Sequence, residues 1–205
     1  ECLWSWAMTL RNQCYSVRGL DAVAAQNIGS TLVNVFSVVY LALGTSVSII
    51  VGNLLGAGKI REAKEADRKI LSFAAVCGLM MGVLMSGVST FFPMLYNTSE
   101  DVRNLASFMI LVSACMMPAH AFSHGTYFTL RSGGQVLITF LLDGIFMWVV
   151  IMPLSFVLSR FTLLPIRPLY IICQGAEILK VFLGLFLLKR DTWAKQLVAD
   201  NTLKQ

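Results

Sequence analysis

A few charged residues lie inside long apolar stretches of this sequence, where a charged side chain is costly and calls for a partner or a function. Asp143 stands in one such stretch, and Glu177 and Lys180 stand three residues apart in another. Asp143 without a partner would tend to take up a proton, so it is a candidate for binding a proton or a sodium ion. It is equally a candidate partner for Lys180. Glu177 and Lys180 are also spaced to neutralise one another on a helix.

Two histidines stand one helical turn apart in another apolar stretch, His120 and His124, just after Pro118. A metal site would need further ligands, and the sequence has no HExxH motif. A proton-linked role, a place in the wall of a substrate cavity and hydrogen-bonded packing all remain open for this pair. The proline removes a backbone donor, so we expect it to kink its helix.

Polar residues also follow helical spacing in the first part of the chain. Asn27, Ser30, Asn34 and Ser37 recur at intervals of three and four, which places them on one helix face beside Gln26. Such a stripe predicts either a face toward a water-filled cavity or hydrogen bonds to a neighbouring helix. A second predicted polar face near the start of the chain combines Glu1, Ser5, Met8, Asn12 and Tyr15, with Arg11 close by.

The composition indicates that membrane-spanning helices position these residues. Of the 205 residues, 57% are hydrophobic and only 13% are charged, about half the usual share of roughly 25% in soluble domains. The net charge of +5 lies mainly in loops, which favours contact with lipid headgroups over binding of nucleic acid. All five cysteines lie in apolar blocks without a CxxC pair, so we interpret them as packing residues, with no metal site or disulfide framework.

Six apolar blocks are long enough, or nearly so, to span a bilayer of about 30 Å. Because short connections join them and a barrel would show alternating strands, the predicted fold is an all-α membrane protein, a bundle of six transmembrane helices. We expect a transmembrane lobe over residues 1–190 and a cytoplasmic tail over 191–205, with Trp193 near the interface. The expected spans are Glu1–Val17, which looks truncated, Val23–Leu55, Ile70–Leu95, Val102–Leu130, Val136–Ser159 and Leu169–Leu188.

The stretch from Gly44 to Lys69 sets both the packing and the orientation of the chain. Small residues at every fourth position predict a face that admits a neighbouring helix closely; they are Gly44, Ser48, Gly52 and Gly56. After Gly56-Ala57-Gly58 we expect a short, exposed, basic helix over 59–69. If this loop is cytoplasmic, ten of the sixteen Lys and Arg residues lie on that side and four on the other, which predicts a cytoplasmic C-terminus.

A third span carries its own small-residue face, with Gly78, Gly82 and Ser86 at intervals of four. It contains no titratable group, so we interpret this face as a helix-packing surface alone.

Several stretches together resemble the second half of a multidrug and toxic-compound extrusion (MATE) family transporter, over essentially the whole chain. The strongest resemblance runs from Gly19 to Ile70 and includes the run VGNLLGAGKIREAKE; further matches are LRSGG with the following FLLD, and QGAEILK in the last span. The resemblance implies twelve helices in two six-helix lobes that rock to give alternating access, and this chain would supply helices seven to twelve. It also implies a multi-pass protein of the cell membrane, the inner membrane in bacteria.

The resemblance implies export of cationic, lipophilic drugs by antiport with Na⁺ or H⁺, with no other cofactor and with a missing N-terminal lobe as partner. Glu1 matches the place of a glutamate at the head of helix seven that helps to bind the coupling cation in many members. NorM-type members also carry an aspartate in helix ten, where this chain has His120 and His124 instead. Some other members place the coupling carboxylate in the N-terminal lobe.

The sequence leaves two sets of candidate site residues. A cation site needs carboxylate and amide oxygens, and the candidates for cation coupling are Glu1, Asn34, Asp143 and Glu177. A drug site needs adaptable aromatic, methionine and polar surface, and the candidates for the substrate cavity are Trp4, Met8, Gln26, Asn27, Tyr40, His120, His124 and Tyr127.

Three alternatives to efflux remain. A related flippase for lipid-linked oligosaccharides would need a strongly cationic cavity, and only Arg11 and Lys180 lie within spans. An integral membrane enzyme would need a nucleophile and base or a metal motif, and we do not expect catalysis. A purely structural role is the third alternative, and the polar stripes speak against it.

Overall fold

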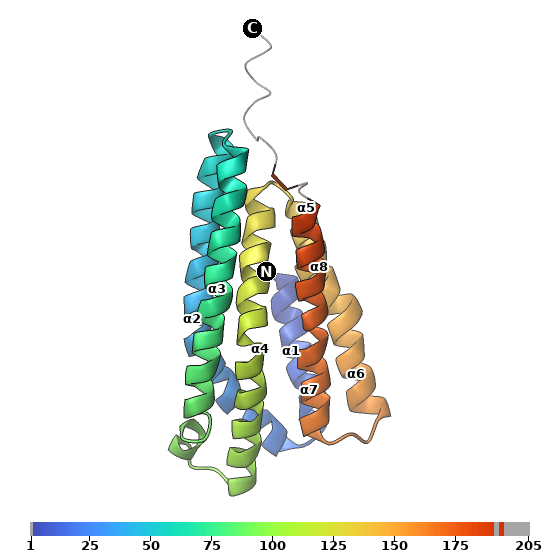
Figure 1. Cartoon of the computed structure of the whole chain (residues 1–205). Helices are drawn as coiled ribbons and strands as arrows, with labels where there is room; N and C mark the ends of the chain where they lie inside the picture. The colour runs from blue at the N-terminus through green and yellow to red at the C-terminus, as the bar shows by residue number, and fades with distance from the viewer. Residues whose placement is uncertain (1, 191–192, 195–205) are drawn as a thin grey trace.

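The computed structural model describes residues 2–190 and 193–194, and all regular elements in this part of the chain are helices (Figure 1). Five helical stretches among the described residues are long and apolar enough to cross a membrane. The remaining expected span, which is the first in the chain, corresponds to α1, a helix of 15 residues. In chain order the elements are α1 (Cys2–Ser16), α2 (Leu20–Gly56), α3 (Ile60–Val88), η1 (Phe92–Leu95), α4 (Glu100–Ser132), α5 (Val136–Phe140), η2 (Leu141–Ile145), η3 (Met147–Ile151), α6 (Met152–Phe161), α7 (Ile166–Ala176) and α8 (Ile178–Lys189).

The helices run side by side, and their connections fall alternately at the two ends of the bundle (Figure 1). The α2–α3 turn, the α4–α5 turn and the end of α8 lie at one end, and the α1–α2, α3–α4 and α6–α7 connections lie at the other. Long apolar side chains such as Phe73, Val83, Leu137 and Phe182 remain exposed on the outside. Such a surface suits contact with lipid, because acyl chains solvate it. The chain is therefore a multi-pass helical membrane protein.

The closest helix packing joins α3 to α4. A Cβ atom added at Gly82 would lie 2.5 Å from the Ala114 carbonyl oxygen, and one at Gly78 would lie 3.0 Å from the Met117 carbonyl oxygen. Only glycine permits the two backbones to approach so closely. The prediction that Gly78 and Gly82 form a helix-packing face is confirmed.

The small-residue face predicted on α2 is only half right. Gly44 packs against the ring of Phe128, and the Ser132 hydroxyl donates a hydrogen bond to the Ser48 hydroxyl at 3.0 Å. A Cβ atom at Gly52 or at Gly56, by contrast, would meet nothing within 4 Å. The four-residue spacing continues past the point where α4 ends, so no described helix packs closely against Gly52 or Gly56.

The α2–α3 turn forms as expected, but the basic segment after it is not a separate helix. Gly58 adopts a φ of 74°, a left-handed conformation that glycine tolerates, and α3 then runs without a break from Ile60 to Val88. The basic residues are therefore the first turns of a membrane span. Among them Asp67 is buried and accepts a hydrogen bond from Thr129 of α4.

The last two spans are irregular. The fifth consists of α5, two π-helical segments and α6, and Asp143 lies in the first π-helical segment, η2. The sixth is divided between α7 and α8, and Glu177 is the residue between them. π-helical turns and interrupted helices cost backbone stability and are common at functional positions. Both interruptions fall at a carboxylate.

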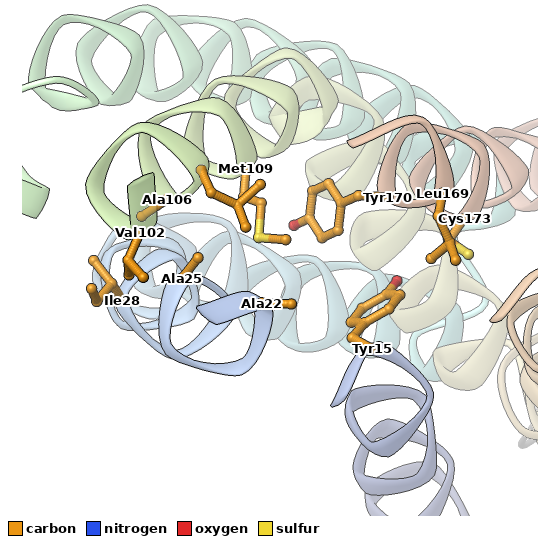
Figure 2. Close-up of a cluster of buried hydrophobic side chains, with 11 residues drawn as sticks. Tyr15, Ala22, Ala25, Ile28, Val102, Ala106, Met109, Leu169, Tyr170 and Cys173 are labelled. Carbon is orange, nitrogen blue, oxygen red and sulfur yellow. The ribbon is translucent and has the colours of Figure 1, made fainter. Parts of the chain in front are cut away.

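The buried apolar residues form several clusters between the helices. The cluster in Figure 2 joins α1, α2, α4 and α7 and includes Tyr15, Ala22, Met109 and Tyr170. Another cluster lies at the end of the bundle that holds the α2–α3 turn, and it includes Trp193. The side chain of Trp193 is buried against the bundle, and its expected position near the membrane interface stays a prediction. The rest of the expected tail lies outside the described residues.

Candidate functional site

The centre of the site is a carboxylate that faces two other helices. Glu177 Oε1 accepts a hydrogen bond from Arg11 Nη1 of α1 at 2.8 Å, and Glu177 Oε2 lies 3.5 Å from His120 Nδ1 of α4. The exposed fractions of the side chains are 11% for Arg11, 17% for Glu177 and 25% for His120. An ion pair so withdrawn from solvent is strongly coupled, because little water screens it.

A second ion pair lies one helical turn further along α8. Lys180 Nζ donates to Asp143 Oδ1 of η2, and both side chains are half-buried. Of the two partners that the sequence allowed for Lys180, the structure contains Asp143. Glu177 takes its hydrogen bond from Arg11 instead, which lies 166 residues away in the chain.

The interrupted helix explains how Glu177 reaches two neighbours at once. Its N–H bonds to the Gln174 carbonyl at 3.1 Å and its carbonyl accepts from the Lys180 N–H at 3.0 Å, so the chain forms tight three-residue turns on both sides. The junction lies within the apolar stretch from Ile166 to Lys189. Interrupted helices at membrane depth occur where the freed groups line a cavity or pack against protein.

A hydrogen-bonded network of uncharged residues lies between α4 and α7, one turn before Glu177. The hydroxyls of Ser113 and Tyr170 lie 2.8 Å apart, and Gln174 Nε2 donates to the Tyr170 hydroxyl at 3.1 Å. The Tyr15 and Tyr170 rings lie near one another, with centroids 5.9 Å apart (Figure 2). Gln174 precedes Glu177 by one turn, so this buried network holds the end of α7, and with it the backbone next to Glu177, against α4.

The other candidates divide between the wall near this cluster and the outside of the lobe. The ring of Tyr40 of α2 lies against that of His124 of α4 in a tilted arrangement, with centroids 5.0 Å apart and planes at 41°, and both side chains are half-buried. Met8 and Tyr127 are also half-buried, so their side chains are partly accessible.

The polar stripe of α2 does not join the cluster. Asn27 and Asn34 are exposed and Gln26 is half-buried, while the hydroxyls of Ser30 and Ser37 donate to carbonyls of their own helix. The prediction that this stripe hydrogen-bonds to neighbouring helices is therefore wrong for the two serines. The exposed amides leave the alternative, a face toward a cavity, as a prediction.

The polar face predicted on α1 also divides. Tyr15 is buried in the core, whereas Ser5 and Asn12 are exposed. Glu1 lies outside the described residues, and so does the side chain of Trp4. Of the four candidates for cation coupling, Asp143 and Glu177 form ion pairs with Lys180 and Arg11, whereas Asn34 is exposed on α2.

Two charged residues with buried or half-buried side chains were not among the predicted site residues. The sequence placed Arg11 within a span and near the polar face on α1, and a lone cation within a span is a signal that an anion must face it. Asp67 was treated as part of an exposed basic helix, and only the continuity of α3 shows that it is buried. In the part of the chain that the structure describes, no group of three or more His, Cys, Asp or Glu residues is arranged to hold a metal ion.

These features define a helical membrane protein that encloses compensated charges between its spans. A family model described as MatE matches residues 1–157 of the chain. The chain therefore belongs to the MatE family. No solved structure matches it.

Three relatives show how far the similarity extends. Multidrug and toxin extrusion protein 2 of Mus musculus is 26% identical over 121 residues, 59% of this chain and 21% of that protein. Multidrug and toxin extrusion protein 1 of Homo sapiens is 23% identical over 175 residues, 84% of this chain and 31% of that protein. The probable multidrug resistance protein NorM of Halalkalibacterium halodurans is 22% identical over 146 residues, 71% and 31% respectively. The matches cover only about a fifth to a third of these relatives.

Proposed function

We propose that the full-length protein exports organic cations and cationic drugs across the membrane by antiport against Na⁺ or H⁺. The proposal includes alternating access, with this chain as one lobe and a second six-helix lobe of the same polypeptide as its partner. Family membership and the names of the relatives support a role in multidrug extrusion.

The observation that carries the proposal is the ion-pair cluster of Arg11, Glu177 and His120 within the membrane-spanning part. Charged side chains within a membrane span are costly, and in membrane proteins they commonly mark the pathways of ions or substrates. A purely structural bundle would gain more from apolar packing, because buried ion pairs rarely stabilise a fold better than apolar residues do.

The wall beside the cluster suits an organic cation. Tyr40 and His124 present neighbouring, tilted rings, and Met8 adds a flexible thioether. Aromatic faces attract cations, and methionine adapts to ligands of different shape. The exposed amides of Asn27 and Asn34 would face the partner lobe or the cavity between the lobes.

The orientation forms part of the proposal. With the α2–α3 turn in the cytoplasm, the basic residues of early α3, the α4–α5 turn and the end of α8 all lie on the cytoplasmic side, because these connections share one end of the bundle. A C-terminal fluorescent fusion that folds only in the cytoplasm tests this orientation. If instead a C-terminal reporter that is active only outside the cytoplasm gave the signal, the proposed orientation would be contradicted.

A flippase for lipid-linked oligosaccharides is the less favoured alternative. Binding of a pyrophosphate would need uncompensated positive charge in the cavity. The two cations at the site, Arg11 and Lys180, are each paired with a carboxylate, Glu177 and Asp143. The charge balance of the cluster therefore favours a cationic ligand.

Dye retention in cells that express the full-length protein tests the function. We expect lower retention of a cationic dye such as ethidium when an inward Na⁺ or proton gradient is present, and higher retention when both gradients are collapsed. Glu100→Gln, an exposed carboxylate at the start of α4, is the matched control and should behave as wild type. Glu1→Gln should reduce export at equal expression. Retention that responds to neither gradient would contradict antiport.

A further inference from the structure

Building on this antiport function, we propose that Glu177 is a shared carboxylate: Arg11 holds one oxygen permanently, and protonated His120 and the cationic group of the substrate alternate at the other. The coupling ion is then the proton, and His120 carries it. The inference assigns the exchange site to the interruption between α7 and α8.

The two oxygens of Glu177 are held unequally. Oε1 accepts a short, charge-assisted hydrogen bond from Arg11 at 2.8 Å. Oε2 lies 3.5 Å from His120 Nδ1, within ion-pair range but longer than a good N–H···O hydrogen bond. Arg11 does not lose its proton in proteins, so its oxygen stays occupied. The contact that can change is the one between Oε2 and His120.

Charge balance makes the imidazole the variable group. Arg11 cancels Glu177, and Lys180 cancels Asp143, so the cluster is neutral while His120 is neutral. Imidazole gains and loses a proton within the physiological pH range. The charged groups that interact with His120 are Arg11 of α1, Glu177 at the α7–α8 junction and Lys180 of α8, which is itself paired with Asp143 of η2. His124 lies one turn further along α4, and Tyr40 of α2 lies against His124. The neighbouring contact with α3 is made through Gly78 and is uncharged.

The exchange follows from this balance. A proton taken up by His120 gives the cluster one positive charge, and the imidazolium then donates from Nδ1 to Glu177 Oε2. A monovalent organic cation at Oε2 gives the cluster the same charge. Both together would place two cations at one carboxylate oxygen, where like charges repel strongly in a site with little water. Arrival of the substrate therefore expels the proton from His120, and arrival of the proton expels the substrate.

The neighbouring rings show where the substrate would lie. His124 is one helical turn from His120, and Tyr40, whose tilted ring contacts that of His124, lies within electrostatic reach of Glu177. A lipophilic cation that places its charge at Oε2 would lay its apolar part against these rings, where cation–π attraction adds to the contact.

The test uses the purified full-length protein in lipid nanodiscs with tetraphenylphosphonium as the probe. In weakly buffered solution, a pH indicator should record about one proton released for each tetraphenylphosphonium bound. On the acid side of the imidazole titration, affinity should fall by about tenfold per pH unit, because proton and probe exclude one another. Both measurements need only the wild-type protein.

Variants then identify the carrier. His120→Gln should abolish proton release and the pH dependence while retaining the affinity that wild type shows at alkaline pH. Glu177→Gln should weaken binding at every pH. The exposed Glu100→Gln on the same helix is the matched control and should release a proton as wild type does. Proton release that persists in His120→Gln would place the carrier elsewhere and overturn the inference.

Failure of the inference can be distinguished from failure of the proposed function. If Na⁺, at constant pH, weakens binding and no proton is released, the protein remains an antiporter but the proton site at His120 is wrong. If the wild-type protein neither binds tetraphenylphosphonium nor lowers dye retention in cells, the proposed function itself fails.

Discussion

Replacing Gly82 by alanine should separate α3 from α4. The added methyl group would lie 2.5 Å from the Ala114 carbonyl oxygen, whereas ordinary contact begins at 3.4 Å. The helices must therefore move apart locally by about 1 Å, and overpacking of this kind typically costs about 1–3 kcal/mol. The obstacle is a backbone atom, so no side-chain rotation can relieve it.

Gly87 of the same helix provides the matched control. A Cβ atom at this position would meet nothing within 4 Å. Gly87→Ala and Gly82→Ala share any gain in helix propensity, which is up to about 1 kcal/mol. The difference between the two variants therefore isolates the clash, and we expect Gly82→Ala to be less stable by about 1–3 kcal/mol.

The measurement is unfolding of the full-length protein by increasing mole fractions of SDS in mixed micelles, followed by tryptophan fluorescence. Linear extrapolation converts the midpoints into free energies when the slopes agree. Equal midpoints for the two variants would refute the close approach of α3 and α4. A higher midpoint for Gly82→Ala would refute it more strongly.

Three further predictions concern buried polar and aromatic groups. Asp143→Asn leaves the half-buried Lys180 ammonium uncompensated and should lower the free energy of unfolding by about 1–3 kcal/mol. Adding Lys180→Met should recover most of that loss in the same SDS titration, and a double variant as unstable as the single one would contradict the ion pair. Thr129→Val removes the donor to buried Asp67 and should cost about 1–3 kcal/mol, with Thr129→Ser as the control that retains a hydroxyl; equal stability of the two variants would count against the hydrogen bond. Trp193→Ala should cost about 3–5 kcal/mol, and unchanged thermal stability by fluorescence-detected size-exclusion chromatography would show that the side chain is not part of the core.

The sequence predicted the spans well because membrane helices are specified by length and apolarity, which are local properties. It also predicted the close packing at Gly78 and Gly82, since small residues at every fourth position mark one face. The same reasoning failed at Gly52 and Gly56. Spacing shows that a face is small, but only the position of α4 decides whether a neighbour is present.

The candidate site was predictable in part. The carboxylates Asp143 and Glu177 and the pair His120 and His124 stood out because polar groups inside spans are rare. Lys180 was a candidate partner for Asp143, and the structure contains that pair. The partner of Glu177 did not follow from the sequence, because Arg11 lies 166 residues away and two helices had to be placed first. The helix interruptions at the carboxylates were not predicted either, although Gly144 lies in η2 and Gly175 lies two residues before the break at Glu177.

The bundle divides into a part of long, regular helices and a part in which the helices are interrupted. Helices α2, α3 and α4 pack continuously, partly through glycine, while the chain from η2 to α8 contains π-helical turns and the break at Glu177. Arg11 and His120 reach Glu177 from other helices. A small bend at the break would therefore change the 2.8 Å contact of Glu177 with Arg11 and its 3.5 Å contact with His120. Bending of the last span and the charge state of this carboxylate are thus coupled.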